Sequence, residues 1–380
     1  MVVQISRHVY GIPIVDNDLD LFESLWPVDG VNYNAYVVVG SEGAAVIDTV
    51  HRRFYTDFLG ELRSVVDPSD IKYIVSQHAE PDHASSIPFL LKDTGAKLVV
   101  SKPGAAMHSW SVEPVAVGNG DKISLGDVEL SFHLTPWVHW PETMVTLLDP
   151  DRVAFTCDLF GAYGPYPDLT PPDWPIYVSE ARRYYATVLS KYARSVSAAV
   201  AKVRTLNPEI IAPGHGVYYT GDTLVDILDL YGAWTSGAQE DRVVILYASM
   251  YGKAANVAEM LSEILSSAGA DVDAFDLARE DWSDVLSFLL GAKVAVIVYP
   301  VYESDVFPPV RFFLQMAADK GLLPDNLFAV ELYGWGSARQ RFEAIVGSVT
   351  RFLSYGPKNP PSLDDLEGLA ADVLRLVSTS

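Results

Sequence analysis

The chain has 380 residues, of which 49% are apolar, and it carries a formal net charge of -22. This length predicts two domains, each large enough to bury its own core. The negative charge excludes nucleic acid as a partner, because binding it requires a basic surface. An acidic surface mainly keeps a protein dissolved, and it weakly favours a donor or substrate that is not strongly anionic.

Two other features restrict the class of protein. The most apolar run, AKVAVIVYPVY, has about half of the ~20 residues that a membrane-spanning helix needs, and we interpret it as a buried strand. The N-terminus, MVVQISRHVYG, lacks the charged head and long apolar stretch of a signal peptide, so we expect a cytoplasmic protein. The single cysteine, Cys157, excludes an intramolecular disulfide and a four-cysteine metal site, and we expect it to be a small buried residue.

In chain order, the first part is rich in predicted strands. Residues 31–50 read as two strands joined by the turn GSEG. The apolar spacing over 177–206 predicts a helix. The other predicted strands of this part cover residues 71–78, 96–101, 128–136, 144–150, 152–158 and 209–216.

The pattern changes near YGAWTSGAQED, residues 231–241, and strands then alternate with helices. The predicted strands cover 242–249, 271–277, 292–300 and 326–334, and the predicted helices cover 256–269, 308–319, 338–347 and 361–377. The last helix begins with a Ser/Asp start signal. Such alternation predicts a parallel sheet covered on both faces. We therefore predict one domain over 1–240 and a second over 241–380.

An unusual cluster of histidines and carboxylates ends the predicted strand 71–78. The stretch SQHAEPDHASS holds His78, Glu80, Asp82 and His83, although the chain has only eight histidines. Pro81 prevents a simple continuation of the strand, so the cluster lies in a loop, where binding groups are often displayed. Two buried carboxylates this close repel each other unless a cation neutralises them. A metal site explains the cluster better than a polar loop with incidental charge.

Three more candidate ligands stand at other predicted strand ends. His139 lies in WVHWPE, Asp158 ends VAFTCD, and His215 ends IIAPGHG. Each alone is a weak signal, but the strands of one sheet can bring their ends to a single edge. Four histidines remain unassigned: His8, His51, His108 and His133. Of these, His133 is the most easily mistaken for a ligand, because it lies in the strand that precedes His139.

This pattern resembles the metallo-β-lactamase fold, a sandwich of two sheets between helices with a dinuclear metal site at one edge. The first motif there is usually H-x-H-x-D-H and binds zinc, whereas here Glu80 replaces the second histidine. The replacement adds a hard anionic oxygen and removes an imidazole, which favours iron or manganese. Counting ligands, we expect His78, Glu80 and His139 to bind one ion. Asp82, His83 and His215 bind the other ion, and the carboxylate of Asp158 bridges the two. Two divalent ions and a bridging hydroxide would then give a nearly neutral site.

The whole chain resembles the flavodiiron proteins, in which a lactamase-like diiron domain precedes a flavodoxin-like domain. The segments HAEPDH, HWPE, CD, PGHG, NYNAYVV and EARRYYA match that family across residues 30–220. The resemblance implies that all seven ligands are retained, and that the chain reduces dioxygen to water or nitric oxide to nitrous oxide. The expected fold is α/β, an N-terminal metallo-β-lactamase-like αβ/βα sandwich followed by a C-terminal flavodoxin-like doubly wound parallel sheet.

A flavodoxin-like sheet binds FMN where its strand order reverses, with the phosphate in the loop after the first strand. That loop, SMYGKAANVAEM, keeps Ser249 but has Lys253 and two alanines where hydroxyls are usual. The second loop, YPVYESDVFPP, lacks a Gly-Ser-Pro-Thr type of pattern, whereas the third, YGWGSARQ, matches well and offers Trp335 for ring stacking. The candidate FMN contacts are Ser249, Met250, Tyr251, Gly252, Lys253, Pro300, Tyr302, Tyr333, Gly334, Trp335 and Gly336.

Three functions are compatible with these motifs. The one we favour is a flavodiiron oxidoreductase, in which an external donor reduces FMN and FMN passes electrons to the diiron centre. The second is a binuclear zinc hydrolase of the metallo-β-lactamase superfamily with a degenerate flavodoxin-like module, against which Glu80 and the appended domain argue. The third is a non-catalytic protein, either a flavin-free electron carrier or a docking partner.

The resemblance also implies partners. We expect a head-to-tail homodimer or a tetramer, with the FMN of one subunit facing the metals of the other. The donor is rubredoxin, a flavin reductase or reduced deazaflavin, and the sequence does not discriminate among them or between oxygen and nitric oxide. Tyr185 in ARRYYA is a candidate catalytic group beside the ligands, and a core position is the equal alternative.

Overall fold

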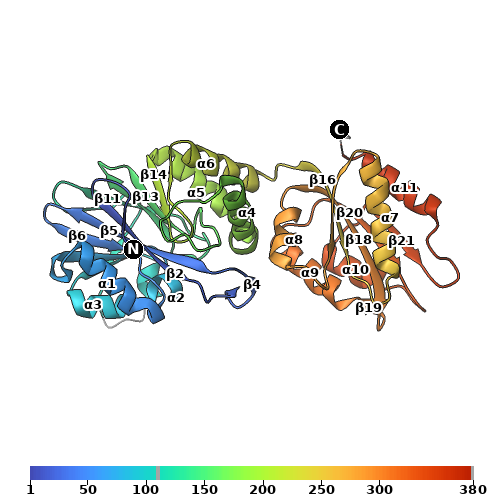
Figure 1. Cartoon of the computed structure of the whole chain (residues 1–380), viewed down its shortest axis with the longest axis horizontal. Coiled ribbons are helices and arrows are strands. Elements are labelled where there is room, and N and C mark those ends of the chain that lie inside the picture. The colour runs from blue at the N-terminus through green and yellow to red at the C-terminus, as the bar shows by residue number, and fades with distance from the viewer. Residues whose placement is uncertain (108–111, 378–380) are drawn as a thin grey trace. The chain divides into compact units, whose positions relative to one another are not determined.

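The structure of the protein is a computed structural model that describes residues 1–107 and 112–377. It divides between Ser236 and Gly237 into two compact units (Figure 1). The boundary predicted from sequence, after residue 240, falls at the first residue of β16 (Glu240–Tyr247). His108 lies outside the described residues.

The first unit contains two stacked sheets. The first sheet has the order β1-β2-β5-β6-β7-β8-β9, with a parallel half from β6 onward. Its strands are β1 (Val3–Gln4), β2 (Val9–Asp16), β5 (Val31–Gly40), β6 (Gly43–Ile47), β7 (Ile71–Ser76), β8 (Lys97–Ser101) and β9 (Val115–Val117). A short hairpin, β3 (Leu21–Phe22) and β4 (Trp26–Pro27), lies between β2 and β5 in the chain.

The second sheet has the order β10-β11-β12-β13-β14-β15. Its strands are β10 (Lys122–Ser124), β11 (Glu129–Leu134), β12 (Met144–Asp149), β13 (Val153–Cys157), β14 (Ile210–Pro213) and β15 (Tyr219–Thr220). One buried cluster joins side chains of both sheets, such as Val38 and Val75 with Phe132 and Phe155. This shared core makes the two sheets a sandwich, because each contributes one apolar face.

Helices cover the outer faces of the sandwich, α1 and α3 on one side and α5 and α6 on the other (Figure 1). Their amphipathic spacing explains the packing, since Phe58, Leu59 and Leu62 of α1 fall on one buried face. The helices and single turns are η1 (Arg52–Phe54), α1 (Tyr55–Val65), η2 (Pro68–Asp70), α2 (Pro81–Ala84), α3 (Ile87–Thr94), η3 (Gly104–Ala106), α4 (Trp174–Tyr184), the π-helical turn η4 (Tyr185–Leu189), η5 (Ser190–Tyr192), α5 (Ala193–Leu206) and α6 (Gly221–Ser236).

The second unit is a parallel sheet with the order β17-β16-β18-β20-β21, to which β19 adds an antiparallel pair with β18. Its strands are β16 (Glu240–Tyr247), β17 (Asp271–Asp276), β18 (Ala292–Tyr302), β19 (Asp305–Val306), β20 (Asn326–Leu332) and β21 (Arg351–Tyr355). The order reverses between β16 and β18, and β18 is buried along most of its length, as a strand covered on both faces requires.

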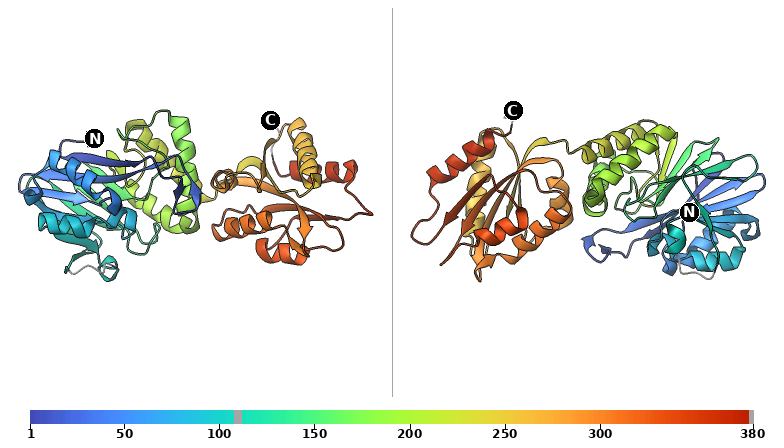
Figure 2. Two further views of the ribbon diagram at one scale, coloured as in Figure 1. Left: turned by 60° about the horizontal axis from the view of Figure 1, so that its bottom comes forward. Right: turned by 180° about the vertical axis from the view of Figure 1, so that it is seen from behind.

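The helices of the second unit are α7 (Lys253–Ser267), α8 (Trp282–Leu289), α9 (Pro308–Asp319), α10 (Arg339–Val346) and α11 (Leu363–Leu374). Figure 2 shows α7 and α11 on one face of the sheet and α9 and α10 on the other. Ser362 and Asp365 form a capping box at the start of α11, which confirms the start signal read from the sequence. The predicted fold class is confirmed in both units.

Several predicted elements differ from the structure. The strand predicted to end at His78 ends at Ser76, so His78 lies in the loop. The helical pattern over 177–206 is not one helix, because η4 and η5 separate α4 from α5. In the described part of the chain, no helix is long and apolar enough to cross a bilayer.

Candidate functional site

Every predicted metal ligand lies in a segment that follows a strand of the sandwich. His78 and Glu80 lie in the loop after β7, and that loop leads directly into α2, which carries Asp82 and His83. His139 lies between β11 and β12, Asp158 follows β13, and His215 follows β14. Because β13 and β14 are parallel neighbours, their carboxyl ends lie side by side.

The first group of side chains surrounds one carboxylate oxygen of Glu80. The Nε2 atoms of His78 and His139 lie 3.1 and 2.9 Å from Glu80 Oε2. The same two Nε2 atoms lie 3.3 and 3.4 Å from Asp158 Oδ2. Two imidazoles and two carboxylates therefore converge on one point with ligand atoms within 4.8 Å of one another.

The second group converges on the other oxygen of Asp158. Asp158 Oδ1 lies 2.9 Å from His83 Nε2 and 3.5 Å from His215 Nε2. Asp82 Oδ2 lies 3.5 and 3.3 Å from the same two nitrogen atoms. Asp158 thus turns one oxygen toward each group, which is the geometry of a carboxylate that bridges two cations.

Residues outside the two groups fix the orientation of the ligands. Glu142 Oε1 lies 2.8 Å from His78 Nδ1 and accepts a bond of 2.9 Å from the backbone N–H of Ala79. His215 Nδ1 lies 2.9 Å from the carbonyl oxygen of Asn32, and such bonds set which ring nitrogen faces the metal. The sequence reasoning missed both partners, although Glu142 belongs to the quoted motif WVHWPE.

Tyr185 is not at the site, and the candidate role given to it is wrong. Its hydroxyl lies 3.4 Å from the carbonyl oxygen of Trp234, among the rings of Tyr231 and Trp234. The preceding residue, Tyr184, donates a hydrogen bond of 3.1 Å to Asp158 Oδ1. Consecutive residues of a helix point about 100° apart, so only one of the two tyrosines can face the ligands.

The remaining described histidines lie outside both groups. His8 pairs with Asp151 at 2.6 Å, and the ring of His51 accepts a bond from the N–H of Arg53. His133 lies 3.1 Å from the hydroxyl of Ser131. The thiol of Cys157 is buried, as expected, and burial raises its pKa well above the usual range, so it stays protonated.

In the two groups, the carboxylates raise the pKa of the histidines and the histidines lower the pKa of the carboxylates. Burial opposes the charged imidazolium, yet Glu142 and Glu80 raise the pKa of His78 to about 9. Asp82 and Asp158 likewise raise the pKa of His83 to about 10, and Asp158 and Glu80 raise that of His139 to about 11. The histidines in turn hold the pKa of Asp158 well below its usual range, against its burial. Without metal, protons occupy positions that cations would otherwise take.

The side chains present fit two metal ions. Asp82 Oδ1, Asp158 Oδ2 and His215 Nε2 are buried atoms with no hydrogen-bond partner, and buried polar atoms are rarely left unpaired without reason. Three carboxylates and four imidazoles supply hard oxygen and nitrogen donors suited to iron or manganese. Glu80 and Asp82 keep 23% and 17% of their side-chain surface exposed, whereas His78, His83 and His215 are fully buried. The site is therefore open on the Glu80 and Asp82 side.

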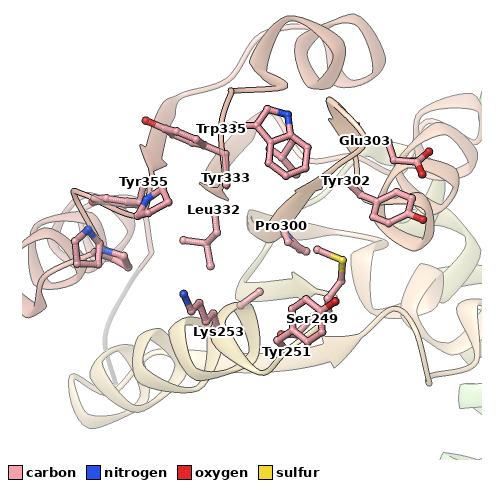
Figure 3. Close-up of a pocket in the computed structure, with 18 residues that line it drawn as sticks. Ser249, Tyr251, Lys253, Pro300, Tyr302, Glu303, Leu332, Tyr333, Trp335 and Tyr355 are labelled. Carbon is pink, nitrogen blue, oxygen red and sulfur yellow. The ribbon is translucent and has the colours of Figure 1, made fainter.

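A cavity of about 480 Å³ opens at the carboxyl ends of the strands in the second unit. The ends of β18, β20 and β21, the loops after these strands and after β16, and the start of α7 line it, at the point where the strand order reverses. Figure 3 shows Trp335 and Tyr251 on opposite sides of the cavity, with Lys253 at the start of α7. Trp335 and Tyr251 are 81% and 89% exposed, which is unusual for isolated large rings and typical of a binding surface.

The cavity also fits a phosphorylated flavin. Ser249 Oγ is buried without a hydrogen-bond partner and belongs to the lining. Gly252, with a φ of 85°, precedes the first turn of α7, whose free backbone N–H groups attract an anion. Lys253, the first residue of that helix, adds a positive charge.

Nine of the eleven candidate FMN contacts line this cavity, and Gly252 and Gly336 do not. Gly252 shapes the turn before α7, and nothing lies within 4 Å of the position that a Cβ of Gly336 would take. The sequence reasoning missed the wall contributed by the loop after β21, because β21 itself was not predicted. The lining residues not anticipated are Ala254, Val301, Glu303, Leu332, Tyr355, Gly356, Pro357, Pro360 and Pro361.

Two protein families match this chain in the same order as its two units. Residues 31–216 match the family described as ODP family beta lactamase, and residues 245–353 match the flavodoxin family. The first range contains all seven predicted ligands, and the second contains the loops after β16, β18 and β20.

Similar proteins cover nearly the whole chain. The type A flavoprotein fprA of Rhodobacter capsulatus is 30% identical over 356 residues, which are 89% of this chain and 81% of the relative. A nitric oxide reductase of Moorella thermoacetica is 28% identical over 89% of this chain and 88% of the relative. The structure of rubredoxin oxygen:oxidoreductase from Desulfovibrio gigas superposes with a TM-score of 0.89 at 25% identity, covering 99% of this chain and 98% of that one. The chain therefore belongs to the flavodiiron proteins, the family of the type A flavoproteins.

Proposed function

We propose that this protein reduces dioxygen to water, nitric oxide to nitrous oxide, or both, at a diiron centre supplied with electrons by FMN. The observation that carries the proposal is Asp158, whose two oxygens face two separate groups of buried ligands. We assign His78, Glu80 and His139 to one iron and Asp82, His83 and His215 to the other. Relatives named as a nitric oxide reductase and an F420H2 oxidase support both candidate substrates.

The zinc hydrolase alternative is disfavoured by the ligand set and by the second unit. A hydrolase needs no flavin, yet the second unit has a parallel flavodoxin-like sheet and a cavity of about 480 Å³ at its switch point. Glu80 supplies a hard oxygen where a zinc site of this fold usually has imidazole. The reading as an oxidoreductase accounts for both features.

When bound, the two irons supply redox equivalents and open coordination positions, and FMN supplies electrons drawn from a donor. The protein contributes the geometry and the surroundings. The hydroxyl of Tyr184 donates a hydrogen bond of 3.1 Å to Asp158 Oδ1 and so holds a proton beside the carboxylate that faces both groups. The rings of Phe22 and Trp140 pack edge-on against His215 and His78, at 5.4 and 5.0 Å between centroids, and so limit water beside the ligands.

The partners extend this proposal. An external electron donor is needed, of the kind that rubredoxin, a flavin reductase or reduced deazaflavin represents. A head-to-tail homodimer or tetramer would bring the flavin of one subunit to the metals of another. We place these reactions in the cytoplasm, where such donors are reduced.

The test combines composition with activity. Protein expressed with iron and flavin should contain two irons and one FMN per chain by metal analysis and by its absorption spectrum. Chemically reduced protein should then consume dioxygen or nitric oxide in a gas-electrode assay. Zinc without flavin bands, or a flavin-loaded diiron protein that consumes neither gas, would contradict the proposal.

The ligand role of Glu80 has its own test. Glu80→His restores the usual zinc motif, so it should raise the zinc-to-iron ratio and abolish gas reduction while the fold is kept. The ratio is measured by metal analysis after growth with both metals, and the fold by circular dichroism. Unchanged iron content and activity would show that Glu80 is not a ligand.

A further inference from the structure

A carboxylate is buried behind the flavin cavity, where a charge is costly. Glu331, in β20, is fully buried, and it is the only charged side chain among the buried described residues of the second unit. Moving an unpaired charge out of water costs several kcal/mol, so a buried carboxylate needs compensating partners. Glu331 forms no ion pair with any described residue, and its partners are all neutral donors.

Three donors from three elements satisfy Glu331. Its Oε2 accepts a bond of 2.7 Å from the N–H of Ala338, immediately before α10, and lies 3.3 Å from the hydroxyl of Tyr299 in β18. Its Oε1 accepts a bond of 2.7 Å from the hydroxyl of Ser354 in β21. The burial of the carboxylate is therefore compensated by bonds that tie β18, β20, β21 and α10 together.

The bond to Ala338 closes a loop that lines the cavity. Residues 333–338 connect β20 to α10, and Tyr333, Gly334 and Trp335 of this loop line the cavity together with Leu332 at the end of β20. Two glycines make the loop flexible in isolation, since glycine has the greatest backbone freedom. Holding its two ends together prepares the loop for a flat ring and lowers the entropy lost on binding.

The charge of Glu331 lies one residue along β20 from the lining of the cavity. Its chain neighbour Leu332 lines the cavity, as does Tyr355, which follows the Ser354 partner. Reduction adds negative charge to a flavin, and a carboxylate without a neutralising cation in a region of low dielectric opposes that addition. Because of this charge, the cavity binds reduced flavin less tightly than oxidised flavin.

We propose that Glu331 is a positioning residue for the flavin. It pre-shapes the loop 333–338 and, by its charge, makes the bound flavin harder to reduce. The proposal rests on the proposed function, because it requires FMN in the cavity. The loop and the charge can be separated, since glutamine keeps the shape of the side chain and removes its charge. The hydroxyl of Ser354 can reverse its role and accept a bond from the amide of such a glutamine.

The experiment uses the full chain, from which flavin is removed and to which FMN is returned. Flavin fluorescence gives the Kd of oxidised FMN, and a spectroelectrochemical titration gives the midpoint potential. Glu331→Ala should weaken FMN binding roughly tenfold or more, because it releases the loop and leaves the N–H of Ala338 unpaired. Glu331→Gln should bind oxidised FMN within about threefold of the wild type and shift the potential upward. A tenfold gain for reduced over oxidised flavin corresponds to about 30 mV for a two-electron couple.

The control is Glu343→Gln on α10, which removes the same charge from a half-buried residue paired with Arg339. It should leave both the Kd and the potential unchanged. Wild-type affinity in Glu331→Ala, or a wild-type potential in Glu331→Gln, would overturn the proposal. If Glu331→Ala fails to fold, Ser354→Ala replaces it: the charge remains, so binding should weaken at an unchanged potential. A wild-type protein that takes up no FMN would refute the proposed flavin function itself, not only the role of Glu331.

Discussion

Glu142 allows one metal position to be tested without changing a ligand. It is buried, and its Oε1 holds both His78 Nδ1 and the N–H of Ala79. Glu142→Ala frees the ring of His78, and loss of such an outer partner typically costs about 10- to 100-fold in metal affinity. We expect this variant to lose one iron to a chelator at concentrations that leave the wild type fully loaded, measured as iron per chain after dialysis.

The matched control is Glu129→Ala, which removes a carboxylate of the same unit that is 42% exposed and that, among the described residues, pairs with Lys122. It should retain two irons. If Glu142→Ala keeps both irons under the same chelator, the orientation of His78 does not depend on Glu142.

Single residues differ in how well the sequence identified them. The ligands were predictable because H-x-E-x-D-H places four donors in six residues, and their types leave few other uses. The role of Asn32 was not predictable, because this residue contacts His215 through its backbone carbonyl, and every residue has one. The choice between Tyr184 and Tyr185 depends on the rotation of α4, and the sequence YY does not specify it.

At the scale of elements, the loop after β14 is built around a glycine that packs on a ligand. A Cβ on Gly214 would lie 2.6 Å from His83 Cε1, closer than real Cβ contacts occur. Gly214→Ala should therefore displace the ring of His83 and remove the second iron, leaving about one per chain by metal analysis. Gly232→Ala in α6, where the nearest atom is 3.6 Å away on a flexible arginine, should keep both irons. Two irons in Gly214→Ala would mean that the loop moves aside.

A regular pattern helped but did not guarantee that an element was predicted, since the buried strand β2 and the amphipathic helices α1 and α8 were not identified from the sequence. Buried strands such as β18 and amphipathic helices such as α9 show clear periods and were found. The strand β21 was missed because it is short and only half-buried, so the alternation of its apolar residues is weak. The part of the cavity wall within residues 355–361 was therefore missed as well. The break between α4 and α5 was missed because the residues of the π-helical turn are all buried and continue the apolar pattern. The turn nevertheless changes the direction in which the following side chains point.

At the scale of the whole molecule, the metal centre determines how stability depends on pH. The pKa of His78, His83 and His139 in the metal-free protein lies at about 9, 10 and 11, above the unfolded value of 6.5. A raised folded pKa stabilises the protein fully below about pH 6.5, and this stabilisation is lost as the pH rises through about 9 to 11. Asp82, with its pKa lowered to about 2, acts in the opposite sense, and its contribution is lost only as the pH falls through that value.

The metal-free protein should therefore unfold progressively more easily between about pH 7 and pH 10, measured by urea titration at fixed salt. The iron-loaded protein should lack this alkaline loss, because its imidazoles are already deprotonated as ligands. It should instead release its iron on acidification, when protons regain those nitrogens. Since three imidazoles are protonated at pH 7 without metal, loading both irons should release about three protons per chain from these rings, and one more if water enters as the bridging hydroxide. The release is measured by calorimetry in buffers of different ionisation enthalpy. Metal-free protein that becomes more stable on the alkaline side, or loading without proton release, would mean that these imidazoles do not exchange protons for iron.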